Sequence, residues 1–155
     1  MEDIRRILAV SWLTQYCQKT IHYAVSLAAK YGAELSVIHV IDNLWLQGWN
    51  LPGMTQTEER GRDIERIKAE LDNIIGGETK EGVKIKKIIK EGDPVEEILK
   101  VIEEEKIDLV IMRTHEEGRI ERLLVGGSND ALIRKMPCSI LLVKKEPDTV
   151  SNGTT

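Results

Sequence analysis

Short runs of Val, Ile and Leu alternate along the chain with longer segments in which apolar residues recur every three or four positions. Uninterrupted apolar runs of this length are typical of strands buried on both faces of a parallel sheet, and the longer segments are typical of amphipathic helices. We expect strands at residues 7–10, 35–41, 83–89, 109–112 and 139–143. We expect helices at about residues 15–31, 56–75, from 94 onwards, and 128–136. This alternation predicts an α/β fold, a doubly wound sandwich, whose ligands bind beyond the carboxyl ends of the strands.

Local signals mark where several of these helices begin and end. Gly32 suits the left-handed residue that ends a helix, and Thr14 suits a helix N-cap. Asp93 followed by Pro94 combines a side chain that caps a first turn with a residue that suits the first helical position. The pair Gly76-Gly77 is expected to end the second helix.

Size and composition narrow the classes of function. The chain has 155 residues, so we expect one domain over residues 1–145 and a polar, disordered tail at 146–155. Acidic residues (26) exceed basic ones (22), and aromatic residues are few, which argues against a nucleic-acid partner. No apolar run is long enough to span a membrane, and no secretory h-region is seen, so we expect a soluble, cytoplasmic protein. Cys17 and Cys138 show no metal-binding spacing and are expected to be small buried side chains.

Three stretches together resemble the universal stress protein family, over residues 7–144. They are ILAVS with AAKYGAELSVIHVID (28–42), EGDPVEEILKVIEEEKIDLVIM (91–112), and LLVGGSNDALIRKMPCSILLV (123–143). The resemblance implies a five-stranded parallel sheet with strand order 3-2-1-4-5 and a role in surviving stress. It also implies a homodimer formed along the last strand, through Ile140, Leu141, Leu142 and Val143. Some members of the family bind ATP and others do not.

The sequence departs from the pattern of the ATP-binding members. They carry Gly, two residues, Gly, nine residues, Gly and then Ser or Thr, together with an Asp at the end of the first strand. Here Arg113 and Glu116 stand at the first two glycine positions, and Ser11 stands at the Asp position. The third glycine is kept as Gly126, but Gly127 follows it and Ser128 comes one residue late.

These departures predict a degenerate nucleotide site. Glycine lets backbone N–H groups approach a phosphate, whereas Arg113 and Glu116 bring long side chains into that space. Glu116 and Glu117 also place negative charge near a polyanion, which Arg113 and Arg119 could offset as anion ligands. If a ligand binds, we expect it at Ser11, Val40, Arg113, Gly126, Gly127, Ser128 and Asn129.

The sequence favours the first of two functions over its alternative, and a third reading is an interaction scaffold whose cleft is filled by its own side chains. The first is a non-enzymatic homodimer that binds a protein partner or a small ligand. The alternative is a switch that binds ATP or AMP, with Mg²⁺ if ATP, and hydrolyses it slowly at most. Structural readings also remain for the same residues: Gly126-Gly127 as a tight turn, and Arg113 paired with Glu116 or Glu117 on the surface.

The sequence also supports predictions for two tryptophans and two histidines. Trp45 and Trp49 lie in a segment without clear periodicity, which could form a lid, an interface or a loop packed on its own helix. His39 is expected to be a partly buried side chain with its hydrogen bonds satisfied, and His22 to be solvated. No catalytic constellation and no metal site can be assembled from the sequence.

Overall fold

The computed structural model describes residues 3–11, 17–42, 56–78, 82–113 and 134–144. Within them lie strands β1 (Arg6–Val10), β2 (Glu34–Asp42), β3 (Ile85–Gly92), β4 (Leu109–Arg113) and β5 (Ser139–Val143). The helices are α1 (Cys17–Tyr31), α3 (Gln56–Glu78) and α4 (Pro94–Glu104). The strands form one five-stranded sheet of order β3-β2-β1-β4-β5, and every pair is parallel. The fold class and strand order predicted from the sequence are therefore confirmed.

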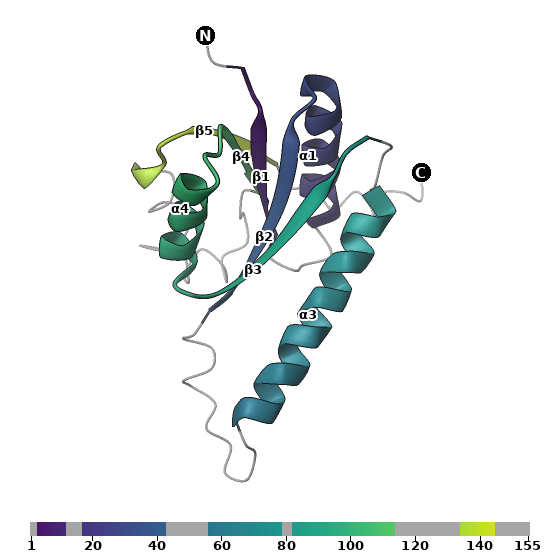
Figure 1. Cartoon of the computed structure of the whole chain (residues 1–155), viewed down its shortest axis with the longest axis vertical. Coiled ribbons are helices and arrows are strands. Elements are labelled where there is room, and N and C mark those ends of the chain that lie inside the picture. Colours follow the sequence, from purple (N-terminus) through teal and green to yellow (C-terminus); the bar gives the residue numbers. More distant parts are fainter. Residues whose placement is uncertain (1–2, 12–16, 43–55, 79–81, 114–133, 145–155) are drawn as a thin grey trace, which may run out of the picture.

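The helices cover both faces of this sheet (Figure 1). On one face α1 and α3 pack on Ile7, Ala9, Val37 and Ile111, and we call this the α1 face. On the other face α4 packs on Leu8, Val10, Ile38 and Met112, and we call this the α4 face. Successive side chains of a strand point to opposite faces, so each strand contributes to both clusters. This is why the strands read as continuous apolar runs in the sequence.

Helix α4 begins where the local signals predict. The Asp93 side chain accepts hydrogen bonds from the backbone N–H groups of Val95 and Glu96, at 2.9 and 3.1 Å. Pro94 occupies the first turn and is buried. Gly32, with φ of +63°, has the left-handed conformation expected just after α1. The expected cap at Thr14 lies outside the described residues.

Several predicted boundaries differ from the structure, and those of α3 and β3 differ most. Gly76-Gly77 does not end α3, which continues to Glu78. A glycine inside a helix costs only about 1 kcal/mol relative to alanine, and the packing of Leu71, Ile74 and Ile75 on the α1 face outweighs that cost. Strand β3 runs over Ile85–Gly92, not 83–89, because its pairing with β2 continues as far as Asp42 opposite Gly92.

Candidate functional site at the carboxyl edge of the sheet

The described part of the predicted site lies where β1, β2 and β4 end. Ser11 directly follows β1, Val40 lies near the end of β2, and Arg113 is the last residue of β4. Val40 belongs to the cluster on the α4 face. Alternation along β1 and β4 places Ser11 and Arg113 on the α1 face with Ala9 and Ile111. Ala9 and Ile111 are register partners, so Ser11 and Arg113 stand level with each other two residues further on.

The rest of the predicted site falls in other segments of the chain. Gly126, Gly127, Ser128 and Asn129 lie outside the described residues, as do Trp45 and Trp49. The same holds for Glu116, Glu117 and the expected tail at 146–155.

Arg113 differs from what its position in a polar loop led us to expect. It is the last residue of a regular strand, pairs in register with Val143, and is only 9% exposed. The Arg113 side chain is therefore not solvent-exposed, and its expected partners Glu116 and Glu117 lie outside the described residues. Lys106 is the one non-glycine residue with positive φ in the described ranges, so the backbone at Arg113 adopts a conformation that needs no glycine. The backbone of β4 at Arg113 accommodates a side chain without strain, and that side chain is buried.

Ser11 directly follows β1 and is hydrogen-bonded to residues of β2. Its backbone N–H donates to the carbonyl of Ile38 at 2.8 Å, which extends the β1–β2 pairing by one step. Its carbonyl oxygen lies 2.9 Å from Nδ1 of His39. Ser11 is 1% exposed. Ser11, which we expected to contact a ligand, is therefore hydrogen-bonded to His39, which we expected to have a structural role.

His39 is a partly buried side chain with a hydrogen-bond partner, as predicted. Burial lowers the pKa of its imidazole, and the hydrogen bond to Ser11 and the negative charge of Glu70 on α3 oppose this shift in part. His22, by contrast, is exposed on α1, as expected. Sequence reasoning missed this contact between His39 and a candidate site residue. The available signal was a histidine inside an apolar run, next to the candidate position Val40.

The start of α1 closes the same edge of the sheet. Nζ of Lys19 donates to the carbonyl of Lys144 at 3.4 Å, which brings the first turn of α1 to the end of β5. Thr20, next to it, is fully buried, and within the described ranges its hydroxyl has no hydrogen-bond partner. Polar groups therefore gather under α1 at the edge where a ligand is expected.

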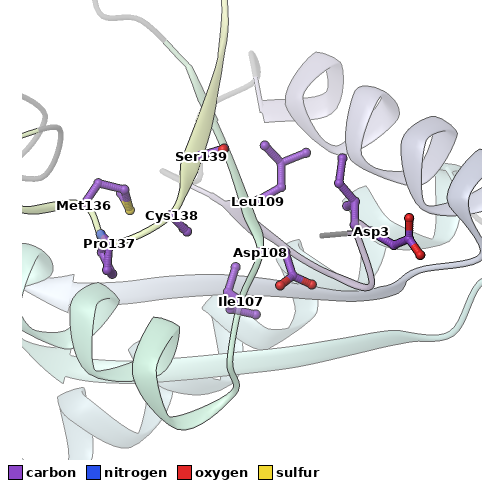
Figure 2. A pocket seen from close by; sticks show the side chains of 9 residues that line it. Asp3, Ile107, Asp108, Leu109, Met136, Pro137, Cys138 and Ser139 are labelled. Atoms are coloured by element: carbon purple, nitrogen blue, oxygen red, sulfur yellow. The ribbon is translucent and has the colours of Figure 1, made fainter. Parts of the chain in front are cut away.

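A cavity lies at the opposite, amino-terminal edge (Figure 2). It has a volume of about 480 Å³ and is lined by Asp3, Ile4, Ile107, Asp108, Leu109, Met136, Pro137, Cys138 and Ser139. Asp108 has a structural task there, since its Oδ2 accepts from the backbone N–H groups of Arg5 and Arg6, both at 2.9 Å. Cys138 is half-buried and free, and burial raises the pKa of its thiol. The thiol form is therefore favoured, which does not suit a nucleophile.

Two classes of feature are not seen in the described part of the chain. Its residues form no group of three or more His, Cys, Asp or Glu side chains that could hold a metal ion. Every helix in these ranges is too short or too polar to span a bilayer.

Comparison with known proteins decides the family. The sequence model of the universal stress protein family matches residues 3–144. The chain belongs to the universal stress protein family. It is 27% identical over 148 residues to a universal stress protein of Methanothermobacter thermautotrophicus, covering 93% of this chain and 99% of the relative. It is 30% identical over 129 residues to the universal stress protein MJ0531 of Methanocaldococcus jannaschii, covering 79% of this chain and 72% of the relative.

Solved structures of universal stress proteins share the fold. The structure of the protein MJ0577 of Methanocaldococcus jannaschii superposes with a TM-score of 0.77 at 25% identity, covering 94% of this chain and 99% of that one. Two more distant structures contain nucleotides. A universal stress protein in complex with cAMP has a TM-score of 0.62 at 15% identity, covering 92% of this chain and 98% of that one. The universal stress protein of Archaeoglobus fulgidus in complex with dAMP has a TM-score of 0.56 at 18% identity, covering 93% of this chain and all of that one.

Proposed function

We propose that this universal stress protein is a cytoplasmic, homodimeric stress-response protein that acts without enzymatic turnover. In this proposal it binds a protein partner or a small ligand through a nucleotide site that has lost its fit to a polyphosphate. The observation that carries the proposal is the state of Arg113. A buried arginine in a regular strand occupies the place where the resemblance implies a glycine beside the phosphates.

The physical argument concerns space and backbone access. A phosphate loop works because bare peptide N–H groups can approach the anion closely. At Arg113 the backbone belongs to β4, paired with β5, and a large side chain fills the volume on the α1 face. Ser11 offers a neutral side chain where the resemblance implies a carboxylate. Both changes weaken a site for ATP, and neither alters Val40, which we expect to flank the base.

The alternative function is a switch that binds ATP or AMP, the former with Mg²⁺, and hydrolyses it slowly at most. It is supported by the nucleotides found in two distant structural relatives, cAMP and dAMP, each of which has a single phosphate. The guanidinium of Arg113 would meet the anion in such a complex. A monophosphate needs fewer exposed backbone N–H groups than a triphosphate, so this alternative favours AMP over ATP.

Calorimetric titration with ATP and with AMP tests the proposal. For wild type we expect no tight binding of ATP, with a dissociation constant well above micromolar. The double variant Arg113→Gly with Glu116→Gly should gain at least about tenfold in affinity for ATP, because it restores glycine at both altered positions. Arg113→Lys, which keeps the charge and most of the bulk, is the matched control and should gain nothing.

The opposite result is equally clear. If wild type binds ATP with a micromolar dissociation constant and the double variant binds no better, the blocked-site argument is wrong and the switch is the better reading. Melting temperatures of all three proteins must accompany the titrations, because Arg113 is buried. Native mass spectrometry of freshly purified protein adds the number of subunits and any nucleotide that co-purifies.

A further inference from the structure

The hydrogen bond between His39 and Ser11 fixes the chemical state of the imidazole ring. The partner of Nδ1 is a backbone carbonyl, which can only accept, so Nδ1 must carry the proton. In a neutral ring the other nitrogen, Nε2, then has a lone pair and no proton. His39 therefore presents a hydrogen-bond acceptor at Nε2, and not a donor.

The surroundings keep this ring neutral and leave Nε2 available. Burial on the α1 face disfavours the charged form and lowers the pKa of His39, although Glu70 on α3 and the Ser11 carbonyl act in the other direction. In the described part of the chain, Ser11 is the hydrogen-bond partner found for the ring. The result is an oriented, uncharged acceptor close to Ser11, the residue that directly follows β1.

The location of the ring links it to the candidate site. Nδ1 lies 2.9 Å from the Ser11 carbonyl, and Ser11 stands level with Arg113 at the carboxyl edge. A ligand that contacts the end of β1 would therefore lie next to an imidazole whose free nitrogen can only accept. Ligand groups that donate a hydrogen bond are favoured there, and groups that only accept are disfavoured.

We propose that His39 is a specificity-determining residue of this site, whose Nε2 accepts a hydrogen bond from a nucleoside moiety. The inference rests on the proposed function, because it requires that a small ligand enter the carboxyl edge of the sheet. Two kinds of donor share the required chemistry: the hydroxyl groups of a ribose and the exocyclic amino group of a base. The His39 ring selects for either one by the same geometry.

Two substitutions of His39 separate contact with the ligand from support of Ser11. His39→Asn places an amide N–H near the position of Nδ1, so it can still donate to the Ser11 carbonyl but offers nothing at Nε2. His39→Gln carries its amide one bond further and can present its oxygen near the position of Nε2. We expect the affinity for AMP, measured by calorimetry, to fall about tenfold in His39→Asn and to be largely retained in His39→Gln. His22→Asn, which changes an exposed histidine of α1, should leave the affinity unchanged.

Ligand analogues identify the donor. Purine riboside monophosphate lacks the amino group, and 2′-deoxy-AMP lacks one hydroxyl. The analogue without the relevant donor should bind wild type about tenfold more weakly than AMP, and should bind wild type and His39→Asn equally. The ¹⁵N chemical shift of His39 Nε2 in the wild-type protein gives a readout that needs no variant, since it should move to lower frequency when the nitrogen accepts a hydrogen bond.

Two results overturn the inference, and they can be told apart. If AMP binds wild type and the affinity survives His39→Asn with no movement of the Nε2 shift, His39 has only a structural role and the proposed function stands. If wild type binds neither AMP nor adenosine, the inference fails together with the ligand-binding part of the proposed function. A His39→Asn variant that does not fold leaves the analogue series and the Nε2 shift in wild type to decide.

Discussion

Inside the folded chain His39 packs on the α1 face of the sheet, and burial lowers the pKa of its imidazole below the ordinary value of 6.5. On acidification the unfolded chain therefore takes up this proton before the folded chain does, so stability falls as the pH falls. The contribution is fully present above about pH 6.5 and is lost as the pH passes through the lower pKa of the folded state. We predict that the free energy of unfolding of wild type falls more between pH 7.5 and 5.5 than that of His39→Asn. Urea denaturation at each pH measures it.

Parallel stability curves for wild type and His39→Asn would contradict the assigned burial effect. The negative charge of Glu70 opposes this lowering of the His39 pKa, but burial has the larger effect.

The sequence predicted where several site residues lie, but not their burial or their hydrogen bonds. Ser11, Val40 and Arg113 could be placed at the carboxyl edge from strand periodicity and a family resemblance, and β1, β2 and β4 bring them there. The burial of Arg113 could not be foreseen, because a charged residue after an apolar run reads as the start of a loop. The hydrogen bond from His39 to Ser11 joins residues 28 positions apart, and no local pattern encodes such a contact.

At the scale of elements, Gly76 shows how packing overrides local preference. It lies inside α3, its φ is not in the left-handed region, and a Cβ built on it would meet nothing within 4 Å. Alanine restricts the unfolded chain more than glycine and suits a helix better. We predict that Gly76→Ala raises the free energy of unfolding by about 0.5–1 kcal/mol, measured by urea denaturation at constant protein concentration.

Gly32 is the matched control for that substitution. A Cβ there would also meet no atom within 4 Å, but φ is +63°, which L side chains rarely adopt. Gly32→Ala should therefore lower the free energy of unfolding by about 1 kcal/mol. If both variants are destabilised alike, α3 does not continue through Gly76 in solution.

The elements that the sequence predicts best are those whose ends depend on neighbouring residues alone. Asp93 caps α4 through its own side chain, so the residues next to it are enough to predict where that helix begins. The bounds of β3 depend instead on its partner: β2 continues to Asp42, and β3 extends to Gly92 opposite it. Helix α3 likewise continues past a glycine pair because its apolar side chains pack on a distant part of the chain.

At the scale of the whole molecule, the two edges of the sheet differ in charge. Strand β3 forms one edge and carries Lys86, Lys87 and Lys90, with Lys84 just before it. Lys86 pairs with Glu105, and Lys87 pairs with Asp72. Lysines along an edge strand oppose pairing with a second chain. Strand β5 forms the other edge and has no charged residue from Ser139 to Val143. Of the two edges, β5 is therefore the one suited to contact between two copies.

The side chains of β5 are not equally suited to testing that contact. Val143 is 5% exposed and belongs to the cluster on the α1 face, and the half-buried Leu141 packs against the same cluster. Ile140 packs against the cluster on the α4 face. Leu142, however, is 42% exposed, which is unusual for a large apolar residue on an uncharged edge. An acidic substitution at Leu142 would place charge at the edge with little loss of core packing.

We predict that Leu142→Asp converts the proposed homodimer to a monomer while the fold is retained. Two carboxylates, one from each copy, would lie close together in an apolar contact, where neither the repulsion nor the desolvation is compensated. Sedimentation velocity at a fixed concentration measures the change, and the melting temperature shows whether the fold survives. Lys84→Asp, next to the other edge, is the control and should leave the sedimentation of wild type unchanged. A Leu142→Asp protein that sediments as a dimer would move the interface away from β5, and a wild type that sediments as a monomer would refute the homodimer itself.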